Sequence, residues 1–122
     1  MRSLVGKNEL LYRTGYLQYM NPDGSATSRT FKLRANKNET ELSVDVASLT
    51  IPTKSIKDPL KFALYEIRNS NVLELGLQTL HDPLPNSESI IDNPAHAVII
   101  GIDINDEIIP AQLARASKRI EI

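Results

Sequence analysis

The apolar run from Ala95 to Ile102 constrains the fold more than any other stretch of the sequence, because His96 is its only strongly polar side chain. A strand with one solvent-exposed face alternates between apolar and polar residues, whereas a strand without that alternation is buried on both faces. We therefore predict that residues 95–102 form the central strand of a sheet.

Other segments alternate at the period of two that is typical of a strand with one exposed face. The signal is clearest at Leu42–Val46. A long strand is predicted over 10–20, with a bend or bulge at Gly15. The alternation of 27–33 predicts a second strand, which pairs with the first as a hairpin through the turn at 21–24. Further strands are predicted over 62–67 and 77–80.

Helical signals are short in the middle of the chain and longer near its end. Asn69 to Asn71 can cap a short helix over 72–75 that ends at Gly76. The segment 49–60 contains two prolines and is predicted to be irregular, with one helical turn. Pro110 near a helix start and an apolar stripe after it predict a C-terminal helix. The stripe consists of Ile109, Leu113, Ala116 and Ile120.

These elements predict an α+β fold, in which a mixed, largely antiparallel sheet of about 5–6 strands carries a short helix and a C-terminal helix. The 122 residues are enough for one hydrophobic core, so we expect a single domain over 1–122. The chain has no cysteine, which excludes a disulfide framework and a cysteine nucleophile and favours the cytoplasm. No membrane contact is expected, because no apolar run reaches about 18 residues.

The net charge of −1 conceals an uneven distribution along the chain. Residues 1–68 contain eleven Lys and Arg against seven Asp and Glu, whereas residues 69–114 contain seven acids and no Lys or Arg. Such an acidic block can mark an interaction surface or a cation site. Alternatively, folding interleaves the blocks into a surface of mixed charge, because neighbours in sequence need not form a patch in space.

Both histidines of the chain, His81 and His96, lie close together in sequence beside proline-containing loops. Imidazole titrates near neutral pH, so the two histidines and Asp82 are candidate catalytic residues of a small hydrolase or nuclease. A phosphate substrate also needs a cationic group. The N-terminal part of the chain offers three candidates for that group, Arg13, Arg29 and Arg34.

The same stretch also carries the ligand types that a divalent metal binds. The candidate metal ligands are His81, Asp82, Asp92 and His96, with Asp103 as a further carboxylate. The acidity of this part of the chain favours a cation over an anion. No other cofactor is expected, because the sequence lacks the glycine-rich phosphate loop, the dinucleotide-binding motif, the zinc-protease motif and the nucleophile elbow.

The two histidines and the basic stretch near Arg29 can also be explained by purely structural roles, without catalysis or ligand binding. A histidine in an apolar strand, such as His96, needs only one or two hydrogen-bond partners, and His81 can cap the end of a strand. The basic stretch 29–37 contains only one aromatic residue, Phe31, and is typical of a charged strand edge. We therefore do not expect binding to nucleic acid.

Several segments together resemble a group of short, uncharacterised bacterial proteins. The segments are Ser28-x-x-Phe31, Leu42-Ser43-Val44-Asp45, Gly76-Leu77, His81-Asp82-Pro83-Leu84-Pro85 and Asn93-Pro94-Ala95-His96-Ala97-x-Ile99-x-Gly101. The resemblance spans roughly residues 10–102 and implies a shared fold without a known activity.

A second resemblance starts from Leu10-Leu11-Tyr12-Arg13, which is similar to the opening strand of some small NAD-consuming toxin domains with an ADP-ribosyltransferase-like fold. In those domains an early arginine helps to hold the dinucleotide. The resemblance therefore implies a ligand-holding role for Arg13.

Two functions from different classes follow from the sequence. The first is a non-catalytic protein-binding module that docks on a larger protein, as an accessory component of a bacterial conflict, antiviral-defence or toxin–antitoxin type operon. The absence of catalytic motifs and the uneven charge favour this function. The alternative is a small hydrolase or nuclease that uses His81 and His96, with or without a divalent metal.

Overall fold

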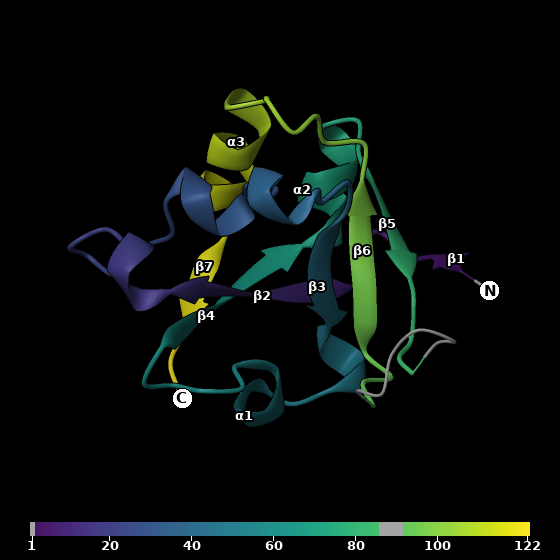
Figure 1. Cartoon of the computed structure of the whole chain (residues 1–122). Helices are drawn as coiled ribbons and strands as arrows, with labels where there is room; N and C mark the ends of the chain where they lie inside the picture. The colour runs from purple at the N-terminus through teal and green to yellow at the C-terminus, as the bar shows by residue number, and fades with distance from the viewer. Residues whose placement is uncertain (1, 86–91) are drawn as a thin grey trace.

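Seven strands form one sheet in which every neighbouring pair is antiparallel, in the order β1-β5-β6-β3-β2-β4-β7 (Figure 1). The computed structural model describes residues 2–85 and 92–122. The strands are β1 (Ser3–Leu4), β2 (Leu10–Tyr16), β3 (Leu42–Val46), β4 (Phe62–Arg68), β5 (Gln78–His81), β6 (His96–Ile100) and β7 (Lys118–Ile120). The predicted α+β class and the largely antiparallel sheet are confirmed, with more strands than expected.

Short helices connect the strands and cover the sheet. The α-helices are α1 (Pro52–Ser55), α2 (Asn69–Glu74) and α3 (Ile108–Ala116), and the 3₁₀ helices are η1 (Leu17–Tyr19), η2 (Ser28–Phe31), η3 (Ala35–Lys37) and η4 (Ala47–Leu49). In the view of Figure 1, α3 and α1 lie on opposite sides of β2, with α2 next to α3. Among the described residues, no helix has the length and apolarity needed to cross a membrane.

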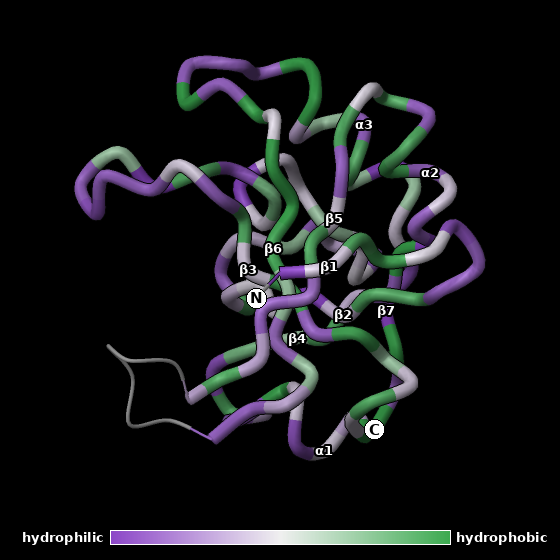
Figure 2. Tube along the Cα trace, turned by 90° about the vertical axis from the view of Figure 1, so that its right-hand side faces the viewer, coloured by the Kyte–Doolittle hydropathy of each residue, from purple (hydrophilic) through white to green (hydrophobic). Residues whose placement is uncertain are grey.

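The core lies between the sheet and the helices α2, α3 and η2. Its fully buried apolar side chains come from strands and helices alike and include Leu11, Phe31, Leu42, Tyr65, Ile67, Val72, Ile99 and Leu113. The apolar run of the sequence forms β6, a hydrophobic stretch in Figure 2. This strand is interior, between β5 and β3, while the middle position of the sheet belongs to β3.

Residues 27–33 do not form the predicted strand, and the predicted hairpin with β2 is wrong. This segment contains η2, and the strands that pair with β2 are β3 and β4. Thr30 and Phe31 are consecutive, yet both are buried. A strand would also place Arg29 and Phe31 on one face, but Arg29 is exposed and Phe31 is buried.

The predicted C-terminal helix is confirmed, but it is shorter than the apolar stripe indicated. α3 buries Leu113 and ends at Ala116, and the chain then forms β7 on the outer edge of β4. There Ile120, which the stripe placed in the helix, pairs with Leu64. An uncovered strand edge leaves backbone N–H and C=O groups without partners, so pairing with β4 favours the extended form.

Candidate functional site

A cleft opens where β2 and β3 separate. β2 pairs with β4 along its whole length, but with β3 only at Leu11 and Tyr12. From Arg13 onward the two strands diverge, with β2 running across the view of Figure 1 and β3 running down it. Residues 29, 30, 32–34 and 36, together with Lys57, line other parts of the cleft. The cavity has a volume of about 570 Å³, which is within the range of small-molecule sites.

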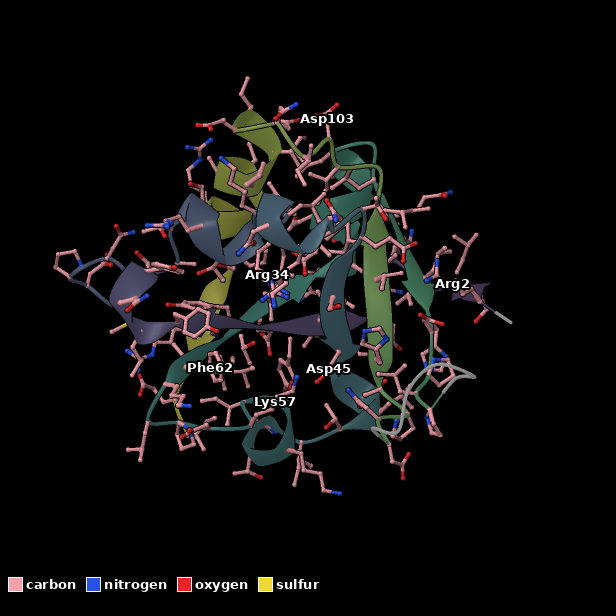
Figure 3. All side chains as sticks on the ribbon, in the orientation of Figure 1. Arg2, Arg34, Asp45, Lys57, Phe62 and Asp103 are labelled. Atoms are coloured by element: carbon pink, nitrogen blue, oxygen red, sulfur yellow. The ribbon has the colours of Figure 1, made fainter. Side chains whose placement is uncertain are left out.

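Cations and aromatic rings dominate the lining of this cleft, which we call the basic cleft. The cations are Arg13, Arg29, Lys32, Arg34 and Lys57, and the rings are those of Tyr16, Tyr19 and Phe62. No Asp or Glu among the described residues lines it. Figure 3 shows Arg34, Lys57 and Phe62 around β2, whereas Arg2 and Asp103 lie at the periphery of the molecule. The three arginines that the sequence offered for a phosphate thus share one site.

Arg13 crosses the gap between the diverging strands. Its Nε donates to the carbonyl oxygen of Thr30 and its Nη1 to that of Ser43, both at 2.8 Å. No carboxylate of the described residues forms an ion pair with Arg13. Burial lowers the pKa of Arg13 to about 10, so the group is still protonated at neutral pH. A partly desolvated cation without a counter-ion favours an anionic ligand.

Gly15 brings η2 against β2 and so places Thr30 for its contact with Arg13. β2 pairs one-to-one with β4 through Gly15, which pairs with Ala63, so the strand has no bulge there. A Cβ at position 15 would collide with Thr30 Oγ1 and lie 2.8 Å from Thr30 Cγ2, so close packing requires the glycine. Thr30 Oγ1 is buried and has no hydrogen-bond partner in the described part of the chain. This unsatisfied polar group is buried in the contact between η2 and β2.

Carboxylates outside the cleft hold two of the cations. Arg34 donates from Nη2 to Glu39 Oε2, and Lys32 donates from Nζ to Glu107 Oε1, both at 2.8 Å. Burial raises the pKa of Glu39, but the hydrogen bonds from Arg34 outweigh it and keep this pKa below its usual value. Lys57 is exposed and has a φ of 67°, a left-handed conformation that costs energy for a residue other than glycine.

Three rings and one guanidinium gather where β2 ends, and we call this group the aromatic shelf. Tyr16 is 44% exposed, with its ring centroid 4.9 Å from that of Phe62 and 5.7 Å from that of Tyr19. The Arg29 guanidinium carbon lies 4.1 Å from the Tyr19 centroid, a cation–π contact. An exposed ring bordered in this way offers a surface on which a planar group can stack.

The structure places His81 and His96 on adjacent strands with separate partners. His81 lies opposite Ala97 in the β5–β6 register, so the neighbouring His96 is on the other face of the sheet. His81 Nε2 donates to the carbonyl oxygen of Pro94 at 2.7 Å, and His96 Nδ1 donates to that of Asp82 at 2.9 Å. The two rings are thus anchored to different backbone carbonyls.

His96 reaches the border of the basic cleft through Ser43. A carbonyl oxygen only accepts, so Nδ1 of His96 carries the hydrogen and Nε2 is an acceptor. Ser43 Oγ lies 3.3 Å from that Nε2, and Ser43 lines the cleft. The carboxylate Oδ2 of Asp82 is 3.9 Å from His96 Nδ1. A hydroxyl and an imidazole are therefore in contact at the edge of the cleft, whereas the Asp82 carboxylate contacts Arg2 and is beyond hydrogen-bond distance of His96.

The candidate metal ligands do not converge within the described residues. In the ranges 2–85 and 92–122, no group of three or more His, Asp or Glu lies close enough to hold a metal ion. Asp92 lines a second depression, and Asp103 accepts a hydrogen bond from the backbone N–H of Asn105 in its own loop. Residues 86–91 of the predicted proline-containing loop lie outside the described residues.

Lys57 and the aromatic shelf are parts of the site that the sequence did not reveal. Lys57 lies in a segment without periodicity, so no local pattern directs its side chain to β2. Among the tyrosines, Tyr65 is a core residue at 1% exposure, whereas Tyr16 is 44% exposed. The one available signal was the density of tyrosines around Arg13.

No protein-family model matches the chain, no curated protein matches it, and no solved structure matches its fold. The geometry of the basic cleft is therefore the basis for a functional proposal.

Proposed function

We propose that the chain is a binding module whose basic cleft holds a phosphate-bearing small molecule. The observation that carries this proposal is the lining itself, which contains five cations and no carboxylate. Three of these cations, Arg13, Arg29 and Lys57, form no ion pair with a carboxylate of the described residues. Like charges repel one another in a confined space, and a bound anion relieves that repulsion. The concave shape and the volume of about 570 Å³ favour a small ligand over an extended polymer.

Phosphate suits the groups that the cleft presents. A guanidinium binds phosphate oxygens through paired hydrogen bonds, and a lysine adds a compact charge. Neither Nη2 of Arg13 nor the ammonium of Lys57 has a hydrogen-bond partner among the described residues, so both are available to a ligand.

Calorimetric titration of the full chain with sodium pyrophosphate at fixed ionic strength tests this proposal. We expect wild-type protein to bind and Lys57→Gln to weaken the affinity by about fivefold, which is about 1 kcal/mol. Arg13→Lys keeps the charge but loses the planar fork, so it should weaken binding further.

The matched control is Lys54→Gln, because Lys54 is exposed on the nearby α1 and does not line the cleft. Circular dichroism verifies that each variant is folded. Absence of binding at millimolar pyrophosphate, or an equal loss in Lys54→Gln and Lys57→Gln, contradicts the proposal.

Hydrolysis is a second candidate function, favoured by the contact between Ser43 Oγ and His96 Nε2 and by the hydrogen bond that orients the imidazole. In this reaction Ser43 Oγ attacks the phosphorus of a bound phosphate ester while its proton passes to His96 Nε2, and the alcohol leaves with that proton as its P–O bond breaks. Water then attacks the phosphoserine, which releases phosphate and restores the serine hydroxyl. The probe is p-nitrophenyl phosphate, with release of p-nitrophenol as the readout. Ser43→Ala and His96→Gln should both abolish the release, and release that persists in either variant rejects this function.

Docking on a larger protein, expected from the sequence, is still a prediction. Leu49 and Ile51 are 48% and 52% exposed and line the second depression together with Pro94. Neighbouring exposed apolar side chains favour a protein contact. Co-purification of the tagged chain with the products of adjacent genes, and its loss in Ile51→Lys, would support this docking.

A further inference from the structure

We propose that the ligand of the basic cleft is a nucleoside phosphate, with its base stacked on the aromatic shelf and its phosphates bound by the cations around Arg13. This inference rests on the proposed function and specifies the class of ligand. The observations behind it concern the rings of the cleft and are independent of its charge.

Aromatic side chains are few in this chain and are concentrated at the cleft. The chain has four Tyr, two Phe and no Trp, and three of these six aromatic residues line the cleft. Phe31 and Tyr65 lie in the core with exposures of 0% and 1%, whereas Tyr16 has 44% of its surface exposed. The chain has few rings available for its core, yet the ring of Tyr16 is exposed to the cavity. This exposure favours a role for Tyr16 in contacting a ligand.

The shelf offers a free position for a flat group. The rings of Phe62 and Tyr19 are inclined to that of Tyr16 by 46° and 77°, so neither stacks face to face on it. Arg29 lies over Tyr19, and a guanidinium plane is itself a surface on which bases stack. A nucleobase against Tyr16 would thus meet a ring face with further flat groups beside it.

The spacing of the two parts of the cleft matches a ligand with a charge at one end and a base at the other. Arg13 and Tyr16 are three residues apart on β2, about 10 Å along the strand, and alternation places their side chains on opposite faces. A ligand that contacts both would therefore cross the edge of β2 that β3 leaves unpaired after Tyr12. In a nucleoside phosphate, the ribose separates the charge from the base. A free phosphate would engage only the cations, and an uncharged nucleoside would engage only the shelf.

Titration of the full chain with ADP, pyrophosphate and ribose 5-phosphate tests this assignment. We expect ADP to bind at least about tenfold more tightly than the other two, because only ADP can stack on the shelf. Tyr16→Leu should remove this preference by weakening ADP binding far more than pyrophosphate binding, and Tyr16→Phe should retain the preference. The control is Tyr12→Leu, on the same strand but outside the cleft lining.

The outcomes distinguish this inference from the proposed function. Equal affinities for ADP and pyrophosphate overturn the nucleoside assignment and leave phosphate binding intact. A preference for ADP that persists in Tyr16→Leu, or ribose 5-phosphate binding as tightly as ADP, also overturns the assignment. If neither ADP nor pyrophosphate binds, both proposals fail. Because the chain has no Trp, quenching of tyrosine emission by ADP gives a second readout, which Tyr16→Leu should reduce.

Discussion

At the scale of single residues, Lys57 contributes charge to the cleft at the expense of backbone strain. Its φ of 67° is rare for any residue with a Cβ, because the left-handed conformation costs about 1–2 kcal/mol. Backbone strain of this kind is concentrated at functional positions, where the surrounding structure holds the residue in place. The position of Lys57 at the basic cleft agrees with that pattern.

Lys57→Gly separates the strain from the charge. Glycine adopts this φ without penalty but loses more conformational entropy on folding, so we expect the free energy of unfolding to rise by up to about 1 kcal/mol. Urea denaturation measures this change. The pyrophosphate affinity should fall as it does in Lys57→Gln. A glycine variant that is less stable than wild type would show that the strain argument is incorrect.

Gly15 is required for close packing, and replacement by alanine tests that role. The new Cβ would overlap Thr30 and push η2 away from β2, which we expect to cost about 1–3 kcal/mol of stability. Pyrophosphate binding should weaken as well, because Arg13 donates to the Thr30 carbonyl. Gly6→Ala is the control, since no atom lies within 4 Å of a Cβ built there. Similar melting temperatures for the two variants would contradict this account.

At the scale of elements, an ion pair holds the segment that follows η3. Glu39 accepts hydrogen bonds from both the backbone N–H and the guanidinium of Arg34, at 2.7 and 2.8 Å. Burial raises the pKa of Glu39, but the Arg34 hydrogen bonds outweigh it and lower this pKa from its ordinary value of 4.5. The ionised carboxylate therefore stabilises the fold above pH 4.5, and this stabilisation is lost as the pH falls through the lower pKa of the folded state.

Glu39→Gln should consequently destabilise the protein in a pH-dependent way. We expect a loss of about 0.5–1 kcal/mol at pH 7, since the pair is partly exposed, and a smaller loss at pH 3, where the wild-type carboxyl is largely protonated in the unfolded state. Chemical denaturation at both pH values measures the difference. A difference between the two proteins that is the same at pH 3 and pH 7 would exclude the ion pair as its cause.

The sequence predicts helices and strands well where a local pattern reflects burial. It predicts them poorly where the conformation of a segment depends on a partner that is distant in sequence. Alternation located β3 because Leu42, Val44 and Val46 all face the core. The three residues of β7 have no such pattern, and their extended form depends on the free edge of β4. For the basic cleft, too, the sequence indicates the residue types but not their arrangement in space. The arginines were recognised by their chemistry, but their convergence depends on where β2 and β3 separate, which no local pattern encodes.

At the scale of the whole molecule, Asn69 connects parts of the chain that are far apart in sequence. This first residue of α2 is fully buried and donates from Nδ2 to the carbonyl oxygens of Val5 and Gly6, at 2.9 and 3.0 Å. Its Oδ1 accepts from Thr79 Oγ1 on β5 at 2.6 Å. One amide thus joins the segment after β1 to α2 and to β5.

Asn69→Ala should cost about 2–4 kcal/mol, because several buried polar groups lose their partners together. Thr79→Val removes one of these hydrogen bonds and should cost about 1 kcal/mol. The double variant should cost less than the sum of the two, since both changes affect one network. Guanidinium denaturation of the four proteins measures this coupling, and strictly additive costs would show that no network exists.

The order of the strands also determines how the chain reaches its folded state. Ser3 pairs with His81 and Leu64 with Ile120, so both edge strands join partners that are remote in sequence. No neighbouring pair in the described sheet is joined by a tight two-residue turn. Each pairing must therefore close a long loop before its contacts compensate for the lost entropy. Refolding after dilution from urea should accordingly take milliseconds to seconds, far slower than the microseconds typical of small helical bundles.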